Sequence, residues 1–115
     1  MNNTGATFQV RVGEYQEGLS WYETLFQRAP DFVPHEDFAE WEIIKGTWLQ
    51  VSQGNPTIGN GPLRLGVSNI AGERKRIMEQ LHINIEPINK REGVPAAWCT
   101  FTDPYGNKIG LYQDL

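Results

Sequence analysis

The stretch FTDPYGNKIGLYQDL at residues 101–115 decides the fold of this chain. Its centre, DPYGN, has the composition of a tight turn. Pro104 fixes φ at the first corner, while Gly106 and Asn107 tolerate positive φ. Asp103 can accept a hydrogen bond from the backbone two residues further on. Because apolar residues alternate on both sides of this turn, the stretch predicts a β-hairpin.

The rest of the chain alternates between strand and helix patterns, and the order of these patterns repeats. In the first half we predict strands at 7–12, 32–33, 38–44 and 47–52, with a helix at 17–26. In the second half we predict strands at 63–67, 83–87, 96–102 and 108–113, with a helix that Asn69 caps and that ends near His82. Between the halves lies GNPTIGNG, residues 54–61, whose glycines and proline are typical of a linker.

Each half therefore has the order strand, helix and then three strands. We predict an α+β fold with a single domain over residues 1–115. This domain is built from two βαβββ modules at 5–53 and 62–115, joined by the linker at 54–61. Sequence identity between the two modules is weak, so the repeat is one of structure.

The composition excludes several classes of function. The net charge of −4 provides no basic face for nucleic acid, and no apolar run is long enough to span a membrane. The first residues lack the charged start and apolar core of a signal peptide. Cys99 is the only cysteine, so no internal disulfide can form, and a reducing, cytoplasmic location is expected.

Three features together resemble the vicinal oxygen chelate superfamily, the group of glyoxalases, bleomycin resistance proteins and dioxygenases. They are the pair Trp21-Tyr22 within LSWYETLF on the first helix, the strand WLQV at 48–51 before the linker, and the DPYGN turn. The resemblance covers nearly the whole chain. It implies curled mixed sheets around a concave site, with the helices on the convex side. For many members of this length it also implies a homodimer with sites near the interface.

Enzymes of this superfamily hold a divalent metal with His, Glu or Gln side chains at four strand positions. The resemblance places these positions at Thr7, Gln50, Pro62 and Gly110. Glycine and proline have no side-chain donor, threonine is a poor one, and a single neutral glutamine does not hold a metal. We therefore expect no metal and no other cofactor, and we expect Gly110 to leave room where an enzyme would carry a ligand.

Alternation along the strands predicts the side chains on the concave face, because the neighbours of core residues face the other way. Across the Lys45-Gly46 turn, a regular hairpin pairs Trp41 with Gln50, which puts both on this face. The resemblance places Trp98 and Thr100 there as well. The predicted ligand-binding residues are Gln9, Arg11, Trp41, Trp48, Gln50, Arg64, Trp98, Thr100 and Tyr112, with Lys108 as a further candidate. We assign no carboxylate and no catalytic residue to this face.

Aromatic walls with a few convergent polar groups are typical of a small-molecule site. The arginines favour a ligand with a carboxylate, a phosphate or another anion. Two alternatives stay open. The same residues could form a dimer interface, where Trp, Tyr and Arg are also enriched. Alternatively, Glu40, Glu42 or an acid from another subunit could neutralise Arg11 and Arg64, and no preference for an anion would follow.

The sequence thus predicts a metal-independent small-molecule binding protein that resembles bleomycin resistance proteins. It would hold an aromatic ligand, to which the arginines add a preference for an anion. The alternative is a metal-dependent lyase or dioxygenase of the glyoxalase superfamily, so enzymatic activity is left open. A third hypothesis is a dimeric accessory or regulatory module without a ligand. We interpret His35 as part of a solvated loop and Cys99 as a small buried hydrophobe.

Overall fold

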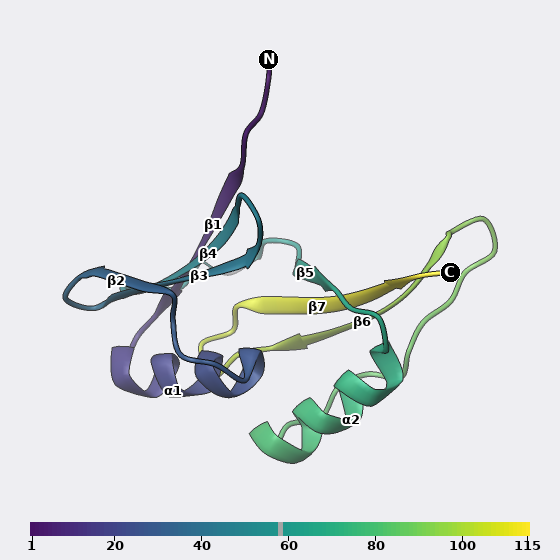
Figure 1. Ribbon diagram of the computed structural model, residues 1–115. Coiled ribbons are helices and arrows are strands. Elements are labelled where there is room, and N and C mark those ends of the chain that lie inside the picture. The colour runs from purple at the N-terminus through teal and green to yellow at the C-terminus, as the bar shows by residue number, and fades with distance from the viewer. Residues whose placement is uncertain (58) are drawn as a thin grey trace. The chain divides into compact units, whose positions relative to one another are not determined.

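The computed structural model describes residues 1–57 and 59–115, which form two compact units (Figure 1). Unit 1 spans Met1–Ile58 and unit 2 spans Gly59–Leu115. The division falls within the segment that the sequence predicts as a linker, although Ile58 itself lies outside the described residues. No helix within the described ranges is both long enough and apolar enough to cross a membrane.

Unit 1 has the predicted order of one strand, a helix and three strands. Its elements are β1 (Ala6–Val12), α1 (Tyr15–Phe26), β2 (Phe32–His35), β3 (Phe38–Ile44) and β4 (Thr47–Gln53). The strands lie in the order β1-β4-β3-β2, with β1 parallel to β4 and the other pairs antiparallel. This mixed sheet confirms the predicted α+β class and the first βαβββ module.

The core of unit 1 is an aromatic cluster between α1 and the sheet. Trp41 of β3 is fully buried, and its ring centroid lies 5.4 Å from Phe26 and 6.5 Å from Tyr22 of α1. Its indole Nε1 donates a hydrogen bond of 3.1 Å to the Arg28 carbonyl, so the polar end of the ring is also satisfied. Leu49 and Val51 of β4 are buried on the same side.

The hairpin of β3 and β4 differs from the regular one that the sequence predicts. The pairing is irregular between Glu42 and Ile44, and beyond this point Trp41 lies opposite Leu49 instead of Gln50. One additional residue in β3 thus shifts the register, as a β-bulge does. The shift turns Trp41 toward Leu49 and the core, so the predicted place of Trp41 on the ligand face is wrong.

Unit 2 contains β5 (Leu63–Gly66), α2 (Ile70–Leu81), β6 (Ala96–Thr102) and β7 (Lys108–Asp114). Its strands lie in the order β5-β7-β6, with β5 parallel and β6 antiparallel to β7. Asn69 caps α2 as predicted, because its side chain accepts a hydrogen bond of 3.1 Å from the Gly72 amide. The helix ends before His82, also as predicted.

The strand predicted at 83–87 does not form, and this prediction is wrong. Instead, Asn89 makes a single antiparallel bridge with Trp98 of β6. Further along β6, the Thr100 amide donates to the carboxylate of Glu86 at 2.8 Å, so a side chain replaces a strand carbonyl. Pro87 provides the physical reason, because proline has no N–H to donate to a ladder.

The same glutamine device anchors the helix in each unit. The side-chain oxygen of Gln53, at the end of β4, accepts a hydrogen bond of 2.7 Å from the Tyr15 amide, the first of α1. Gln113 of β7 likewise accepts a hydrogen bond of 2.8 Å from the Ile70 amide, the first of α2. These bonds satisfy a backbone donor that a helix start leaves unpaired. They also align β4 with β7, so Gln50 corresponds to Gly110.

The DPYGN turn has the predicted geometry, with one difference. The carboxylate of Asp103 accepts hydrogen bonds of 2.9 Å from the Tyr105 and Asn107 amides. Gly106 has a positive φ of 85°, but Asn107 does not share this conformation. The Asn107 side chain instead donates to Asp103 at 2.7 Å, and both residues are buried. The turn is therefore a closed network that fixes where β7 begins.

Candidate functional site

The predicted ligand-binding residues of unit 2 share one face of its sheet. Cys99 and Leu111 are buried toward the core, so the alternate residues of β6 and β7 face the other way. We call this surface the Arg64 face, and it consists of Arg64, Gly66, Trp98, Thr100, Gly110 and Tyr112. The predicted orientations of Arg64, Trp98, Thr100 and Tyr112 agree with this pairing.

Two glycines make room for the two largest side chains of the Arg64 face. Gly110 lies between Arg64 and Thr100 in the register, and a Cβ at Gly110 would come within 2.8 Å of Arg64 Cγ. The stem of Arg64 therefore lies across Gly110 and fills the space that the sequence led us to expect as empty. A Cβ at Gly66 would meet the ring and hydroxyl of Tyr112 at 2.9 Å.

The polar groups of the Arg64 face are available to a ligand. Among the described residues, the Arg64 guanidinium, the Thr100 hydroxyl and the Tyr112 hydroxyl have no hydrogen bond or ion pair. Trp98 lies directly opposite Tyr112 across β6 and β7 and is half-buried. The face thus combines an unpaired cation and two hydroxyls with two aromatic rings.

The remaining predicted residues lie on one face of unit 1, opposite the aromatic core. We call this surface the Gln50 face. It consists of Thr7, Gln9 and Arg11 of β1, Trp48, Gln50 and Ser52 of β4, and Phe38, Glu40 and Glu42 of β3. Gln9 Nε2 donates to Gln50 Oε1 at 3.4 Å, and Arg11 Nε donates to Gln9 Oε1 at 3.4 Å. The predicted orientations of Gln9, Arg11, Trp48 and Gln50 agree with this register.

The Gln50 face carries carboxylates, which contradicts the expectation of a face without them. Glu40 lies opposite Gln50, and Glu42 lies opposite Trp48. The Glu42 carboxylate accepts a hydrogen bond of 3.0 Å from the Gly46 amide and so supports the turn. The side chain of Glu40 has no such partner among the described residues. The same bulge that buries Trp41 brings these two acids to this face.

The residues at the four positions of the implied metal do not fit a divalent cation. In the observed register Thr7 pairs with Trp48, so the residue beside Gln50 is Gln9, and Arg64 instead of Pro62 lies beside Gly110. The corrected set is two mutually hydrogen-bonded amides, a guanidinium and a glycine. Arginine is a permanent cation and offers no lone pair to a metal. Within residues 1–57 and 59–115, no three His, Cys, Asp or Glu side chains gather in a group that could hold a metal ion.

Cys99 lies behind the Arg64 face and has no chemical role there. It is fully buried between Trp98 and Thr100 in the sequence, and its side chain turns toward the core. Burial raises the pKa of the Cys99 thiol, although nearby Arg74 opposes this shift. A buried thiol with a raised pKa is a poor nucleophile. This supports the interpretation of Cys99 as a core residue.

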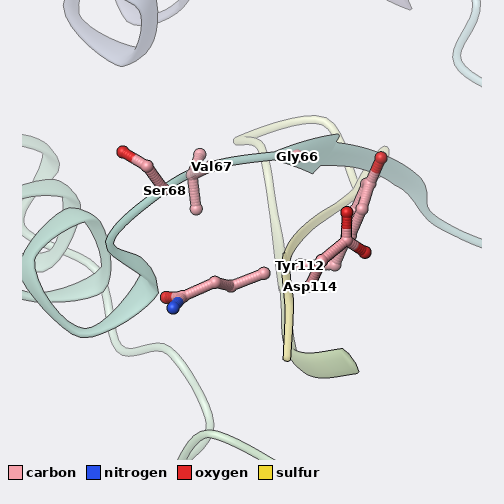
Figure 2. Close-up of a pocket in the computed structure, with 6 residues that line it drawn as sticks. Gly66, Val67, Ser68, Tyr112 and Asp114 are labelled. Carbon is pink, nitrogen blue, oxygen red and sulfur yellow. The ribbon is translucent and has the colours of Figure 1, made fainter. Parts of the chain in front are cut away.

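A shallow pocket adjoins the Arg64 face at the ends of β5 and β7 (Figure 2). Its volume is about 390 Å³, and it is lined by Gly66, Val67, Ser68, Tyr112, Gln113 and Asp114. Figure 2 shows the Asp114 carboxyl group beside the Tyr112 ring, whereas the Ser68 hydroxyl points away from both. The sequence analysis identified Tyr112 but missed Asp114, although both lie on the same side of β7 by simple alternation.

The solved structures that resemble this chain share its fold at low sequence identity. One is a glyoxalase/bleomycin resistance protein from Catenulispora acidiphila, 22% identical, with a TM-score of 0.80 over 96% of this chain and 98% of that one. A second is a genomically encoded fosfomycin resistance protein from Listeria monocytogenes, 12% identical, with a TM-score of 0.73 over 100% and 94%. A third is a lactoylglutathione lyase from Agrobacterium tumefaciens, 14% identical, with a TM-score of 0.71 over 94% and 91%.

No protein-family model matches the sequence, and no curated protein matches it. The structural comparisons show that the chain has the glyoxalase/bleomycin resistance fold, as the sequence resemblance predicts. This fold carries a lyase as well as resistance proteins among the matched structures. The function must therefore be argued from the side chains of the two faces.

Proposed function

We propose that this chain, with its glyoxalase/bleomycin resistance fold, is a metal-independent binding protein for a small aromatic anion. The observation that carries the proposal is the position of Arg64 across Gly110. This position holds an unpaired guanidinium beside the rings of Trp98 and Tyr112. A carboxylate can pair with the guanidinium through two hydrogen bonds, and a flat ligand can contact the rings.

The donor set supports binding without a metal. A family-type centre would need about three oxygen or nitrogen ligands, and the corresponding residues here are Gln9, Gln50, Arg64 and Gly110. A cation at Arg64 would repel a metal ion from the position next to Gly110. We therefore favour binding over the metal-dependent lyase or dioxygenase, which remains the competing hypothesis.

Unit 1 contributes a second predicted set of ligand-binding residues, Gln9, Arg11, Trp48 and Gln50. Their side chains form a hydrogen-bonded row that runs across β1 and β4. Glu40 makes this surface less cationic than the sequence predicts, so the preference for an anion rests on the Arg64 face of unit 2. The homodimer and the cytoplasmic location stay predictions.

Tryptophan fluorescence tests whether the Arg64 face binds an aromatic anion. Trp21 and Trp41 are buried, so a ligand on a sheet surface is expected to act mainly on Trp48 or Trp98. We expect para-pentylbenzoate to change the emission of the wild-type protein in a saturable way. Trp98→Phe should lose most of this change, because the ring at the site is no longer the emitter.

Trp48→Phe is the matched control, because it removes the corresponding half-buried indole from the Gln50 face. We expect this variant to keep the wild-type response. A response lost in Trp48→Phe but kept in Trp98→Phe would move the site to unit 1 and contradict the proposal. A response that appears only after Mn²⁺, Ni²⁺, Zn²⁺ or Fe²⁺ is added would favour the metal-dependent alternative.

A further inference from the structure

The pocket of Figure 2 continues the Arg64 face along β7, and its charge has the opposite sign. Gly110, Tyr112 and Asp114 alternate with core residues and lie on one side of the strand. Arg64 crosses the strand at Gly110, whereas Asp114 lies four residues further on. At about 3.3 Å per residue, the two charged positions are roughly 13 Å apart. Tyr112 lies between them.

The Asp114 carboxylate is free to meet a ligand. It makes no hydrogen bond or ion pair with any of the described residues. Gln113, which also lines the pocket, already accepts a hydrogen bond from the Ile70 amide. The Ser68 hydroxyl points away from Tyr112 and Asp114 in Figure 2. Asp114 and the Tyr112 ring are therefore the features of this pocket that would recognise a charged group.

We infer that this pocket binds a protonated amine of the ligand. A carboxylate next to an aromatic ring recognises an ammonium group, because the carboxylate pairs with the charge and the face of the ring attracts it. The inference rests on the proposed function, in which Arg64 binds the anionic end of the same molecule. The ligand class is then an elongated aromatic zwitterion, with its carboxylate at Arg64 and its amine at Asp114.

Matched ligands test the inference. Para-(aminobutyl)benzoate carries an ammonium group where para-pentylbenzoate ends in a methyl group, and phenylbutylamine carries the ammonium alone. We expect the wild-type protein to bind the aminobutyl compound about fivefold more tightly than the pentyl compound by isothermal titration calorimetry, as partly exposed ion pairs allow. In Asp114→Asn this gain should disappear, and phenylbutylamine should bind more weakly than to the wild type.

Two further variants serve as controls. Glu92→Gln removes the same charge from an exposed loop of unit 2, and Ser68→Ala changes the pocket wall at the hydroxyl that points away. Both should keep the fivefold gain. If Asp114→Asn also keeps it, the amine is attracted by the net negative charge of the protein and the inference is wrong.

The outcomes separate the inference from the proposed function. If para-pentylbenzoate does not bind, the Arg64 proposal fails, while binding of phenylbutylamine that depends on Asp114 would still support an amine pocket. If para-pentylbenzoate binds and the amine adds nothing, the Arg64 proposal stands and the amine pocket is refuted. If neither class of ligand binds, both are refuted.

Discussion

Trp41→Ala is expected to lower the free energy of unfolding by about 3–5 kcal/mol, the usual cost of removing a large buried aromatic side chain. Trp41 is fully buried, contacts the rings of Tyr22 and Phe26, and donates a hydrogen bond to the Arg28 carbonyl. The substitution leaves a cavity in the middle of unit 1 and removes the partner of that carbonyl. Urea denaturation followed by circular dichroism measures the loss.

Trp48→Ala is the matched control, because Trp48 lies on the opposite face of the same hairpin and is only half-buried. We expect it to cost about 1 kcal/mol or less, in the range of surface substitutions. Equal costs for the two variants would contradict the register with the bulge. A Trp41→Ala variant that kept its stability and lost ligand binding would contradict it as well.

Gly110→Ala is expected to weaken the binding of para-pentylbenzoate about tenfold, the loss of one charge-assisted hydrogen bond of about 1.5 kcal/mol. The new methyl group would come within 2.8 Å of Arg64 Cγ and 3.2 Å of the Cys99 carbonyl oxygen. Because the carbonyl belongs to the backbone, the Arg64 side chain must move away. Calorimetric titration of the ligand into both proteins measures the effect.

Gly61→Ala provides the control for Gly110→Ala. No atom lies within 4 Å of a Cβ at Gly61, so the substitution adds a methyl group in open space. We expect wild-type affinity and nearly wild-type stability from it. Unchanged affinity in Gly110→Ala would mean that the position of Arg64 across this glycine does not matter for binding.

The sequence predicted the elements that depend on local chemistry. The DPYGN turn forms because Asp103 and Asn107 bond within the turn and Gly106 adopts a positive φ. The start of α2 forms because Asn69 caps it. These signals lie within a few residues of one another, so no tertiary information is needed to interpret them.

The errors came from interactions between segments that are distant in the sequence. A bulge in β3 shifts the register by one residue, and only the burial of Trp41 against α1 shows why this register is favoured. The segment at 83–87 has the apolar alternation of a strand, yet Pro87 cannot donate and Glu86 bonds the β6 edge instead. Alternation alone predicts a face correctly only where the ladder is regular.

The candidate site shows the same division between local and distant information. The strands β5, β6 and β7 pair regularly, and the sequence placed Arg64, Trp98, Thr100 and Tyr112 on one face. It did not predict that the stem of Arg64 fills the space above Gly110, because that contact joins neighbouring strands. The space we had expected there for a ligand holds the side chain that we propose binds it.

The most direct test of the central claim is the affinity of the metal-free protein for para-pentylbenzoate, measured by calorimetry with a chelator present. We predict measurable binding by the wild type, about tenfold weaker binding by Arg64→Gln, and wild-type binding by the matched loop variant Arg91→Gln. Equal affinity in Arg64→Gln and the wild type, or binding that requires an added divalent metal, would contradict the account.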